Sequence, residues 1–420
     1  MKKSARFDLY SVFLSLVGML GLFSIVVPNS FQFVTVTLLA LSFVASLLIS
    51  RGRYENSTVF FLYFLGCFVT AVYLLVGVVN GAPKEALFQV FFIYIVSPLM
   101  WLVVIVHVVS SVREEVLVKA FSFYAILSIL SVALFFYLYN VYGPSSVSLF
   151  KENANVHLSN GYAAATMHVY GSLIFITGAF FSALDLRQSK FLKAFLLLGL
   201  LVVAFTSGRS ALLLSVPLGL AFGFLCQIGS VKRIFLNIIA LSLVLLVSLF
   251  SGFMLAYLFE IDIFQILDRF FNKLLQGGGE ARFTQAKALL DGIDNNYGLG
   301  SGHGVGVEYL RSERFPWRYE AIWLATVYRT GFIGAIIYAL PYVFLAWMVL
   351  VSVLMKRIDV YDRFFGGGML AVFFASTTNP YIEAFSFQWM YAFPIVYYFR
   401  KFNLLKGFSY RGSHESSCFG

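Results

Sequence analysis

The chain alternates apolar runs with short links that are rich in charged residues. An apolar run of about 20 residues spans the hydrocarbon core of a bilayer as a helix. A transmembrane β-barrel would instead alternate apolar and polar positions in segments of about ten residues, and this chain does not. The pattern predicts an all-α, polytopic integral membrane protein with about twelve transmembrane helices, over residues 9–28, 31–50, 58–80, 86–110, 118–140, 161–184, 191–206, 209–228, 234–258, 331–355, 364–379 and 381–399.

One long polar segment separates the ninth predicted span from the tenth. It divides the chain into nine spans over 1–258, a large loop over 259–330, and three spans with a tail over 331–420. Apolar positions in 260–275 recur at helical spacing, which predicts an amphipathic helix on the membrane surface. A second helix is predicted over 280–291, ended by a glycine.

Composition and charge fix the orientation. Hydrophobic residues make up 60% of the chain and charged residues 12%, whereas a soluble domain carries about 25% charged residues. Lys and Arg gather on alternate links, and the opposite short links hold only Lys84, Lys151 and Arg209. Because cytoplasmic loops are enriched in Lys and Arg, both termini are predicted to be cytoplasmic and the large loop periplasmic.

The same orientation excludes several function classes. The net charge of +10 is explained by cytoplasmic links, so no nucleic-acid partner is predicted. The glycine cluster GLGSGHG at 298–304 lacks the G-x-G-x-x-G register and faces a compartment without ATP. Cys67, Cys226 and Cys418 are far apart, so neither a disulfide framework nor a metal site is predicted, and no cofactor is expected.

Arginines on the outward side are the first candidates for chemistry. Arg209 opens a predicted span, Arg269 flanks the predicted surface helix, and Arg282 lies in the first turn of the next helix, where it opposes the helix dipole. The planar guanidinium holds two oxygens at once and never loses its charge, which suits a diphosphate. Several such groups near a bilayer suggest an anionic, lipid-attached substrate, although contact with lipid headgroups is the alternative.

Glu320 is the candidate carboxylate at the membrane boundary. It could form a structural ion pair with Arg318 or Arg329, or it could act as general base for a sugar hydroxyl. The residues alone leave both interpretations open.

Five segments together resemble the bacterial O-antigen ligase and polymerase superfamily. TSGRSALL at 206–213 is similar to the family's S-R-G-A segment, and Arg282 with the following glycine cluster is similar to its arginine helix and glycine turn. Glu320 to Gly334 matches the spacing of its H-N-x-x-L…G-x-x-G segment. HLSNGYAAA at 157–165 and NPY at 379–381 complete the resemblance, which covers roughly residues 150–400.

One departure favours the polymerase branch. The ligase signature begins with histidine and asparagine, and this chain has Glu320 and Ala321 at those positions. The polymerase branch is more divergent, so a polymerase of lipid-linked repeat units is the preferred interpretation. The alternatives are a ligase that moves the finished glycan onto a lipid core, and a transporter of lipid-linked sugar. A transporter would bind near the membrane midplane, whereas the unusual residues here lie outside.

The resemblance implies a GT-C-like scaffold in the bacterial inner membrane and a metal-independent, inverting glycosyl transfer from a polyprenyl-diphosphate-linked oligosaccharide. Arg209 and Arg282 would stabilise the departing diphosphate, and Glu320 would orient or deprotonate the attacking hydroxyl. A chain-length regulator protein is a further expected partner. The remaining residues predicted to bind substrate are Arg269, Arg311, Arg314, Arg318, Asn160 and His303.

Overall fold

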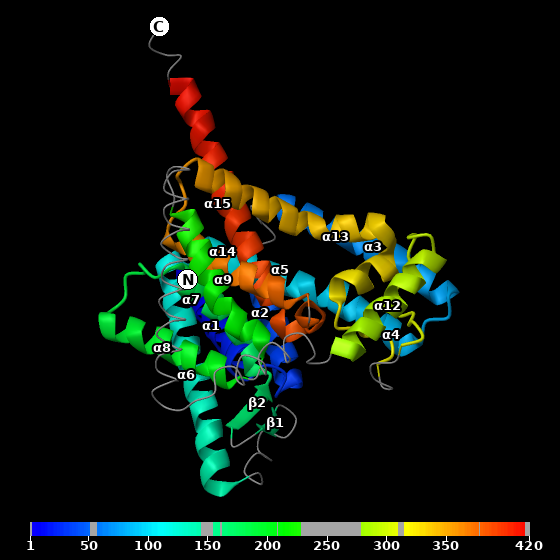
Figure 1. Cartoon of the computed structure of the whole chain (residues 1–420). Helices are drawn as coiled ribbons and strands as arrows, with labels where there is room; N and C mark the ends of the chain where they lie inside the picture. Colours follow the sequence, from blue (N-terminus) through cyan, green and yellow to red (C-terminus); the bar gives the residue numbers. More distant parts are fainter. Residues whose placement is uncertain are drawn as a thin grey trace.

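A computed structural model describes residues 2–50, 57–143, 154–159, 162–207, 209–227, 279–309, 315–377 and 379–415. Helices dominate this part of the chain, as predicted, and one two-stranded hairpin interrupts them (Figure 1). The elements are α1 (Lys2–Gly21), η1 (Leu22–Val26), α2 (Gln32–Ser50), α3 (Ser57–Val79), α4 (Lys84–Phe91), η2 (Phe92–Val96), α5 (Ser97–Ser111), α6 (Glu114–Tyr142), β1 (Ala154–Ser159), β2 (Tyr162–Met167), α7 (Val169–Ser182), α8 (Lys190–Thr206), α9 (Ser210–Cys226), α12 (Gly279–Asn295), α13 (Ile322–Leu354), α14 (Val360–Ala375), η4 (Tyr381–Glu383), η5 (Phe385–Phe387) and α15 (Trp389–Glu415).

The described helices fit a membrane protein. Six of them are long and apolar enough to cross a bilayer, namely Leu9–Val26, Gln32–Ser50, Thr58–Val79, Lys84–Ser111, Glu114–Tyr142 and Ile322–Leu354. The shorter α7 and α9 are also apolar. The predicted span at 234–258 and the predicted surface helix at 260–275 lie outside the described residues.

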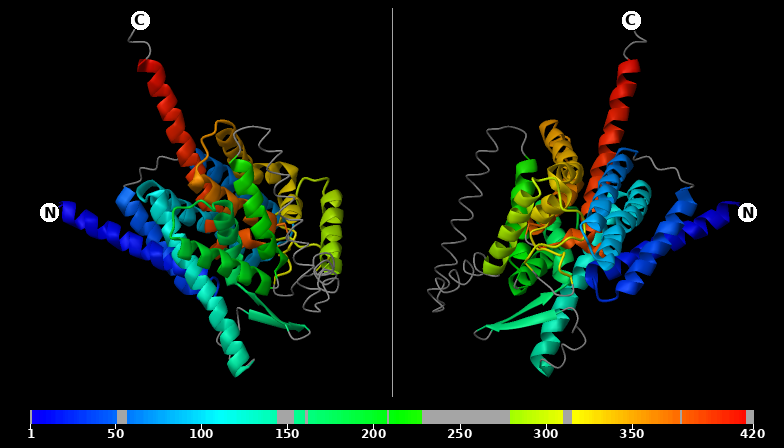
Figure 2. Two further views of the ribbon diagram at one scale, coloured as in Figure 1. Left: turned by 60° about the vertical axis from the view of Figure 1, so that its left-hand side comes forward. Right: turned by 90° about the vertical axis from the view of Figure 1, so that its right-hand side faces the viewer.

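The predicted span at 161–184 begins too early. Residues 162–167 form β2, which pairs with β1 in antiparallel register from Ala154↔Met167 to Ser159↔Tyr162, and α7 starts only at Val169. In the rotated views the hairpin projects beyond the helices, beside the end of α6 (Figure 2). The alanines of β2 continue an apolar run in the sequence, which is why a helix was predicted there. In the structure the backbone N–H and C=O groups of each strand bond to the partner strand instead.

Two more predicted boundaries move because the backbone bends. The span predicted at 331–355 belongs to α13, which begins at Ile322 and is kinked at Gly331 (φ 63°). The span predicted at 381–399 begins with two short 3₁₀ turns, η4 and η5, before α15 starts at Trp389. These turns and the segment before α13 bring polar side chains to one end of the helix bundle.

Small residues let the central helices approach closely. α7, α9 and α14 pack on one another, and a Cβ at Gly219 would lie 2.6 Å from the carbonyl oxygen of Gly178. A Cβ at Gly178 would in turn lie 2.7 Å from the carbonyl oxygen of Gly367. Helix association within a bilayer relies on such close backbone contacts, because lipid supplies no hydrophobic drive between helices.

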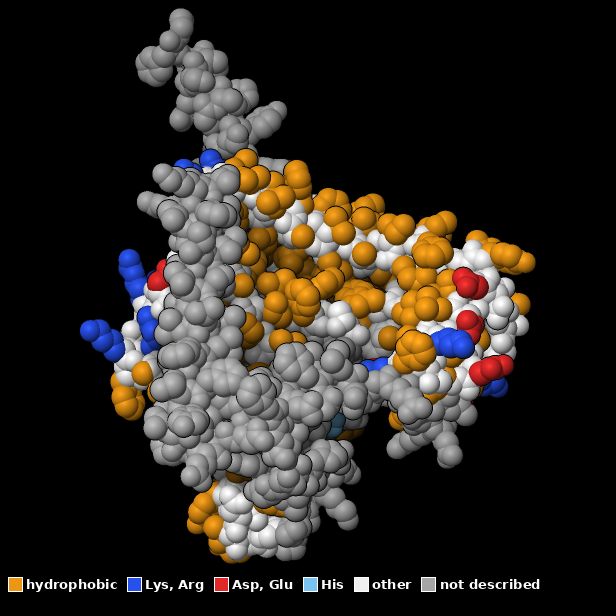
Figure 3. Space-filling view, viewed as in Figure 1, with side chains coloured by type: hydrophobic (Ala, Val, Ile, Leu, Met, Phe, Trp, Pro, Cys, Tyr) orange, Lys and Arg blue, Asp and Glu red, His pale blue; other side chains and the backbone are white. Residues whose placement is uncertain are grey.

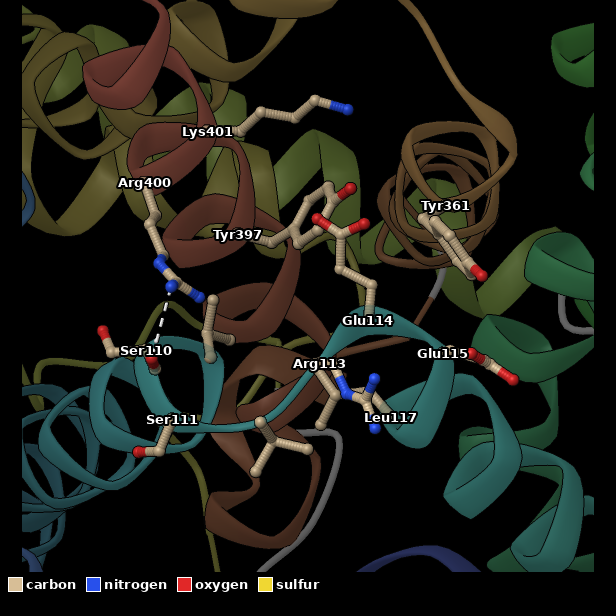
Figure 4. A pocket seen from close by; sticks show the side chains of 12 residues that line it. Ser110, Ser111, Arg113, Glu114, Glu115, Leu117, Tyr361, Tyr397, Arg400 and Lys401 are labelled. Atoms are coloured by element: carbon tan, nitrogen blue, oxygen red, sulfur yellow. Dashed lines mark hydrogen bonds between the residues drawn. The ribbon is translucent and has the colours of Figure 1, made fainter. Parts of the chain in front are cut away.

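The links predicted to be cytoplasmic meet at one end of the bundle. Arg363 donates to Asp185 at 2.5 Å, and Arg400 donates to the carbonyl oxygen of Ser110. A pocket of about 450 Å³ opens there between the start of α6 and the middle of α15 (Figure 4). At the other end Asn29 contacts His168 and Ser386.

The glycine cluster at 298–304 is a packing segment between α3 and α13. Its backbone N–H groups donate to carbonyl oxygens on both helices: Ser301 to Tyr328, Gly302 to Arg329, and His303 to Tyr73. The backbones come so close that a Cβ at Gly302, whose φ is +92°, would lie 2.3 Å from the nitrogen of Gly77. Glycine is therefore required by both conformation and space.

Replacing Gly302 with alanine should prevent this packing and lower the yield of folded, detergent-solubilised protein. Gly81 is the matched control, because its φ is +79° and a Cβ there meets nothing within 4 Å. Gly81→Ala should cost only the backbone term of about 1–2 kcal/mol. Thermal unfolding followed by size-exclusion chromatography measures both variants. Equal melting temperatures for the two would contradict the packing role.

Candidate functional site

Arg209 is held at the start of α9 by the turn that follows α14. Its Nη1 donates to the hydroxyl oxygen of Tyr381 in η4 at 2.7 Å, and its guanidinium lies 6.0 Å from the Tyr381 ring centre. Ser207 accepts a hydrogen bond from the Arg209 backbone. The Nε of Arg209 is buried and finds no acceptor within the described part of the chain. The side chain is therefore fixed while part of its donor capacity remains unused.

Arg282 and Glu320 form an ion pair between α12 and the segment before α13. The Nε of Arg282 donates to Oε2 of Glu320 at 2.8 Å. The Arg282 side chain is 40% exposed and that of Glu320 is 24% exposed. The buried amide of Gln285 accepts from the backbone N–H groups of Glu320 and Ala321 and fixes the approach to α13. The ion-pair partners predicted for Glu320 were Arg318 or Arg329, and the pairing with Arg282 was not predicted.

Arg209 and Glu320 both affect the hydroxyl group of Tyr381. Burial raises the pKa of the Tyr381 hydroxyl, the Arg209 guanidinium lowers it, and the negative charge of Glu320 raises it again. The negative charge of Glu320 therefore affects the pKa of the hydroxyl group that accepts the hydrogen bond from Arg209. Of the three residues predicted to be catalytic, Arg282 and Glu320 are in direct contact, and Arg209 bonds to Tyr381, whose hydroxyl is affected by the charge of Glu320.

A second ion pair, which is buried, joins α13 to η4 and was not predicted. Arg329 of α13 is 3% exposed and pairs with Glu383 of η4, which is 8% exposed. Arg329 also donates to the carbonyl oxygen of Trp317 at 2.5 Å, and the Tyr94 hydroxyl donates to Glu383 at 2.8 Å. Buried charges of this kind persist only when they are paired and hydrogen-bonded.

An apolar pocket of about 380 Å³ adjoins the charged residues. It lies between α3, η2, α5, α13 and α15, and Figure 3 shows hydrophobic side chains along α13 and in the hollow beside it. Ile322 and Ile382, which follow Glu320 and Tyr381 closely in the chain, line this pocket together with Tyr94. Residues one or two positions after Tyr381 and Glu320 therefore line the apolar pocket.

The other predicted substrate-binding residues have different outcomes. Arg318 donates to Gln89 at 3.2 Å and stacks on Phe315, with 4.4 Å from its guanidinium carbon to the ring centre. His303 is 1% exposed, and its Nε2 lies 3.2 Å from the Tyr338 hydroxyl. This burial does not fit a substrate-binding role for His303. The remaining predictions fall outside the described residues, namely Arg269, Arg311, Arg314 and Asn160.

Two aromatic residues of the large loop have structural roles. Trp317 and Tyr319 are 7% and 0% exposed, so neither ring is available for stacking on a sugar. Trp317 donates to Gln89 at 2.9 Å, and Tyr319 accepts from the backbone of Val307 at 2.6 Å. Trp317 therefore holds the loop against α4, and Tyr319 links two parts of the loop to each other. The roles of Gln89, Gln285 and Tyr381 were not predicted, because their partners are distant in the chain.

No group of three or more His, Cys, Asp and Glu side chains that could hold a metal ion occurs among the described residues. Comparison with known proteins adds no relative: no protein-family model, no curated protein and no solved structure matches this chain.

The burial of His303 predicts a pH dependence of stability. Burial, and secondarily the charge of Arg329, lowers its pKa to about 3 from about 6.5 in the unfolded chain. Between these values the unfolded chain binds the additional proton, so stability falls as pH drops below about 6.5 and is unaffected by His303 above it. Melting temperatures between pH 4 and 8 should fall less steeply on the acid side for His303→Gln than for the native chain. Parallel curves would contradict the buried, neutral state.

Proposed function

We propose that this protein is a polymerase of O-antigen or a related surface polysaccharide. It joins oligosaccharide repeat units that are carried on polyprenyl diphosphate, at the periplasmic face of the bacterial inner membrane. The helices form a GT-C-like scaffold in this proposal, with both termini in the cytoplasm. A chain-length regulator protein is the proposed partner.

The proposal rests on three features of connected segments: Arg209 bonded to Tyr381, the Arg282–Glu320 pair, and an apolar pocket lined by the nearby Ile322 and Ile382. Arg209 bonds to Tyr381, Arg282 pairs with Glu320, and the charge of Glu320 affects the Tyr381 hydroxyl. The adjoining pocket is lined almost wholly by apolar and aromatic side chains. A diphosphate attached to a long hydrocarbon chain has matching chemistry, because its headgroup needs fixed cations and its tail needs an apolar surface.

In the proposed reaction, a hydroxyl oxygen of one repeat unit attacks the anomeric carbon of another. A new glycosidic C–O bond forms as the bond from that carbon to the diphosphate oxygen breaks, and the configuration inverts. Polyprenyl diphosphate leaves with the bonding electron pair, and Arg209 and Arg282 stabilise its negative charge. The hydroxyl proton passes to the Glu320 carboxylate and then to water.

The Arg282–Glu320 pair gives this reaction an order of events. In the structure Glu320 Oε2 is occupied by the Nε of Arg282. A bound diphosphate carries more charge than one carboxylate and competes for the same fork of donors. When Arg282 moves to the diphosphate, the carboxylate is released for the acceptor hydroxyl. Exposed ion pairs are weak, about 0–1 kcal/mol, so the exchange costs little.

The proposed role of Arg282 predicts that Arg282→Ala lowers the rate of chain extension by about 100-fold or more. Arg209→Ala should have a similar effect, and Arg282→Lys should restore part of the rate, because an ammonium keeps the charge but loses the fork. Surface-polysaccharide ladders and the rate of polymer formation by reconstituted protein measure these effects.

Lys287→Ala is the matched control, since Lys287 is an exposed cation on the same helix, α12. It should extend chains at the native rate. Normal ladders from both arginine variants, with protein correctly inserted, would refute the diphosphate role. Loss in all three variants would point to a general need for positive charge on α12 instead.

A further inference from the structure

The charged cluster is assembled from two segments that are far apart in the chain. One is the segment at 315–321, which carries Glu320 into α13. The other is η4, which carries Tyr381 and thereby anchors Arg209. The distance between Glu320 and Arg209 depends on how these two segments are joined.

A single buried guanidinium joins them. The Nη2 of Arg329 donates to the carbonyl oxygen of Trp317, three residues before Glu320. The Nη1 of the same side chain donates to Glu383, two residues after Tyr381. The Tyr319 ring lies under the guanidinium, 5.6 Å from its central carbon.

The carboxylate side of the pair is fixed as well. Tyr94 of η2 donates its hydroxyl to Glu383 at 2.8 Å, and Tyr94 also lines the apolar pocket. The neighbouring Gln388 lines the same pocket and accepts from Ser97 at 2.7 Å. The orientation of η4 is therefore coupled to the wall of the pocket.

We propose that Arg329 and Glu383 are positioning residues: their buried ion pair sets the distance between Glu320 and Arg209 and links it to the apolar pocket through Tyr94. This inference rests on the proposed function for its consequence in catalysis, but the positioning itself is testable without activity. Neither residue touches the substrate. A lipid chain that enters the pocket contacts Tyr94 and, through the ion pair, holds the charged cluster in its working geometry.

Glu383→Gln tests the proposal, because glutamine keeps the size and hydrogen-bonding capacity of the side chain and removes its charge. With a polyprenyl-diphosphate-linked repeat unit as substrate, the rate constant kcat should fall at least about tenfold, while KM for that substrate stays within about twofold. Tyr94→Phe retains the ion pair and should show a smaller loss of kcat. Asp185→Asn is the control, because it breaks the ion pair with Arg363 at the opposite end of the bundle.

A distance measurement separates positioning from activity. Spin labels are placed at Phe283, which is 74% exposed on α12, and at Thr377, an exposed residue between α14 and η4. They report the separation between α12, which bonds to Glu320 through Arg282 and Gln285, and the turn that leads into η4. Cys67, Cys226 and Cys418 are first replaced by serine. Glu383→Gln should shift or broaden the distance distribution, Tyr94→Phe should do so less, and Asp185→Asn should leave it unchanged.

The outcomes are distinguishable. An unchanged distribution together with an unchanged kcat in folded Glu383→Gln would overturn the positioning role. If Glu383→Gln does not fold, an unchanged distribution and kcat in Tyr94→Phe would overturn it in the same way. A shifted distribution in a protein whose native form makes no polymer would uphold the positioning role and refute the proposed function.

Discussion

The site depends on the need to neutralise a charge inside the protein. Arg329 is almost completely buried, and an isolated guanidinium in that place would be very unfavourable. The Glu383 carboxylate and the carbonyl oxygen of Trp317 accept its hydrogen bonds, and Tyr94 donates to Glu383. Removing one member of such a group typically costs about 3–5 kcal/mol. The segments on either side of the pair therefore have little freedom, and these segments carry Glu320 and Tyr381.

Close packing makes this arrangement possible. The segment at 298–304 enters between α3 and α13 only because glycine removes the side chain at the points of closest approach. Its backbone bonds to Tyr328 and Arg329 fix the part of α13 that carries the buried guanidinium. The kink at Gly331 then turns the rest of α13 along α3, where both helices wall the apolar pocket. The packing of the 298–304 segment, the neutralisation of Arg329 and the wall of the apolar pocket therefore all involve α13.

Much of the helical arrangement could be predicted from the sequence, and the pairing of side chains could not. Long apolar runs identify helices such as α2, α3 and α6 because the bilayer thickness sets their length. The hairpin was missed although Asn160-Gly161 is a typical hairpin dipeptide, because the alanines that follow continue an apolar run. Arg209 and Tyr381 are 172 positions apart, and Arg329 and Glu383 are 54 apart. Partners at such separations follow only from the tertiary fold, which is why Arg282 was not predicted as a partner of Glu320.

The central claim is that this arrangement forms a glycosidic bond between lipid-linked repeat units. The most direct measurement incubates the purified protein, in vesicles, with a polyprenyl-diphosphate-linked oligosaccharide as the sole substrate. The account predicts a ladder of products longer than one repeat unit, with one polyprenyl diphosphate released for each bond formed. Movement of the intact lipid-linked oligosaccharide across the vesicle membrane, with no new glycosidic bond, would contradict the claim and favour a transporter.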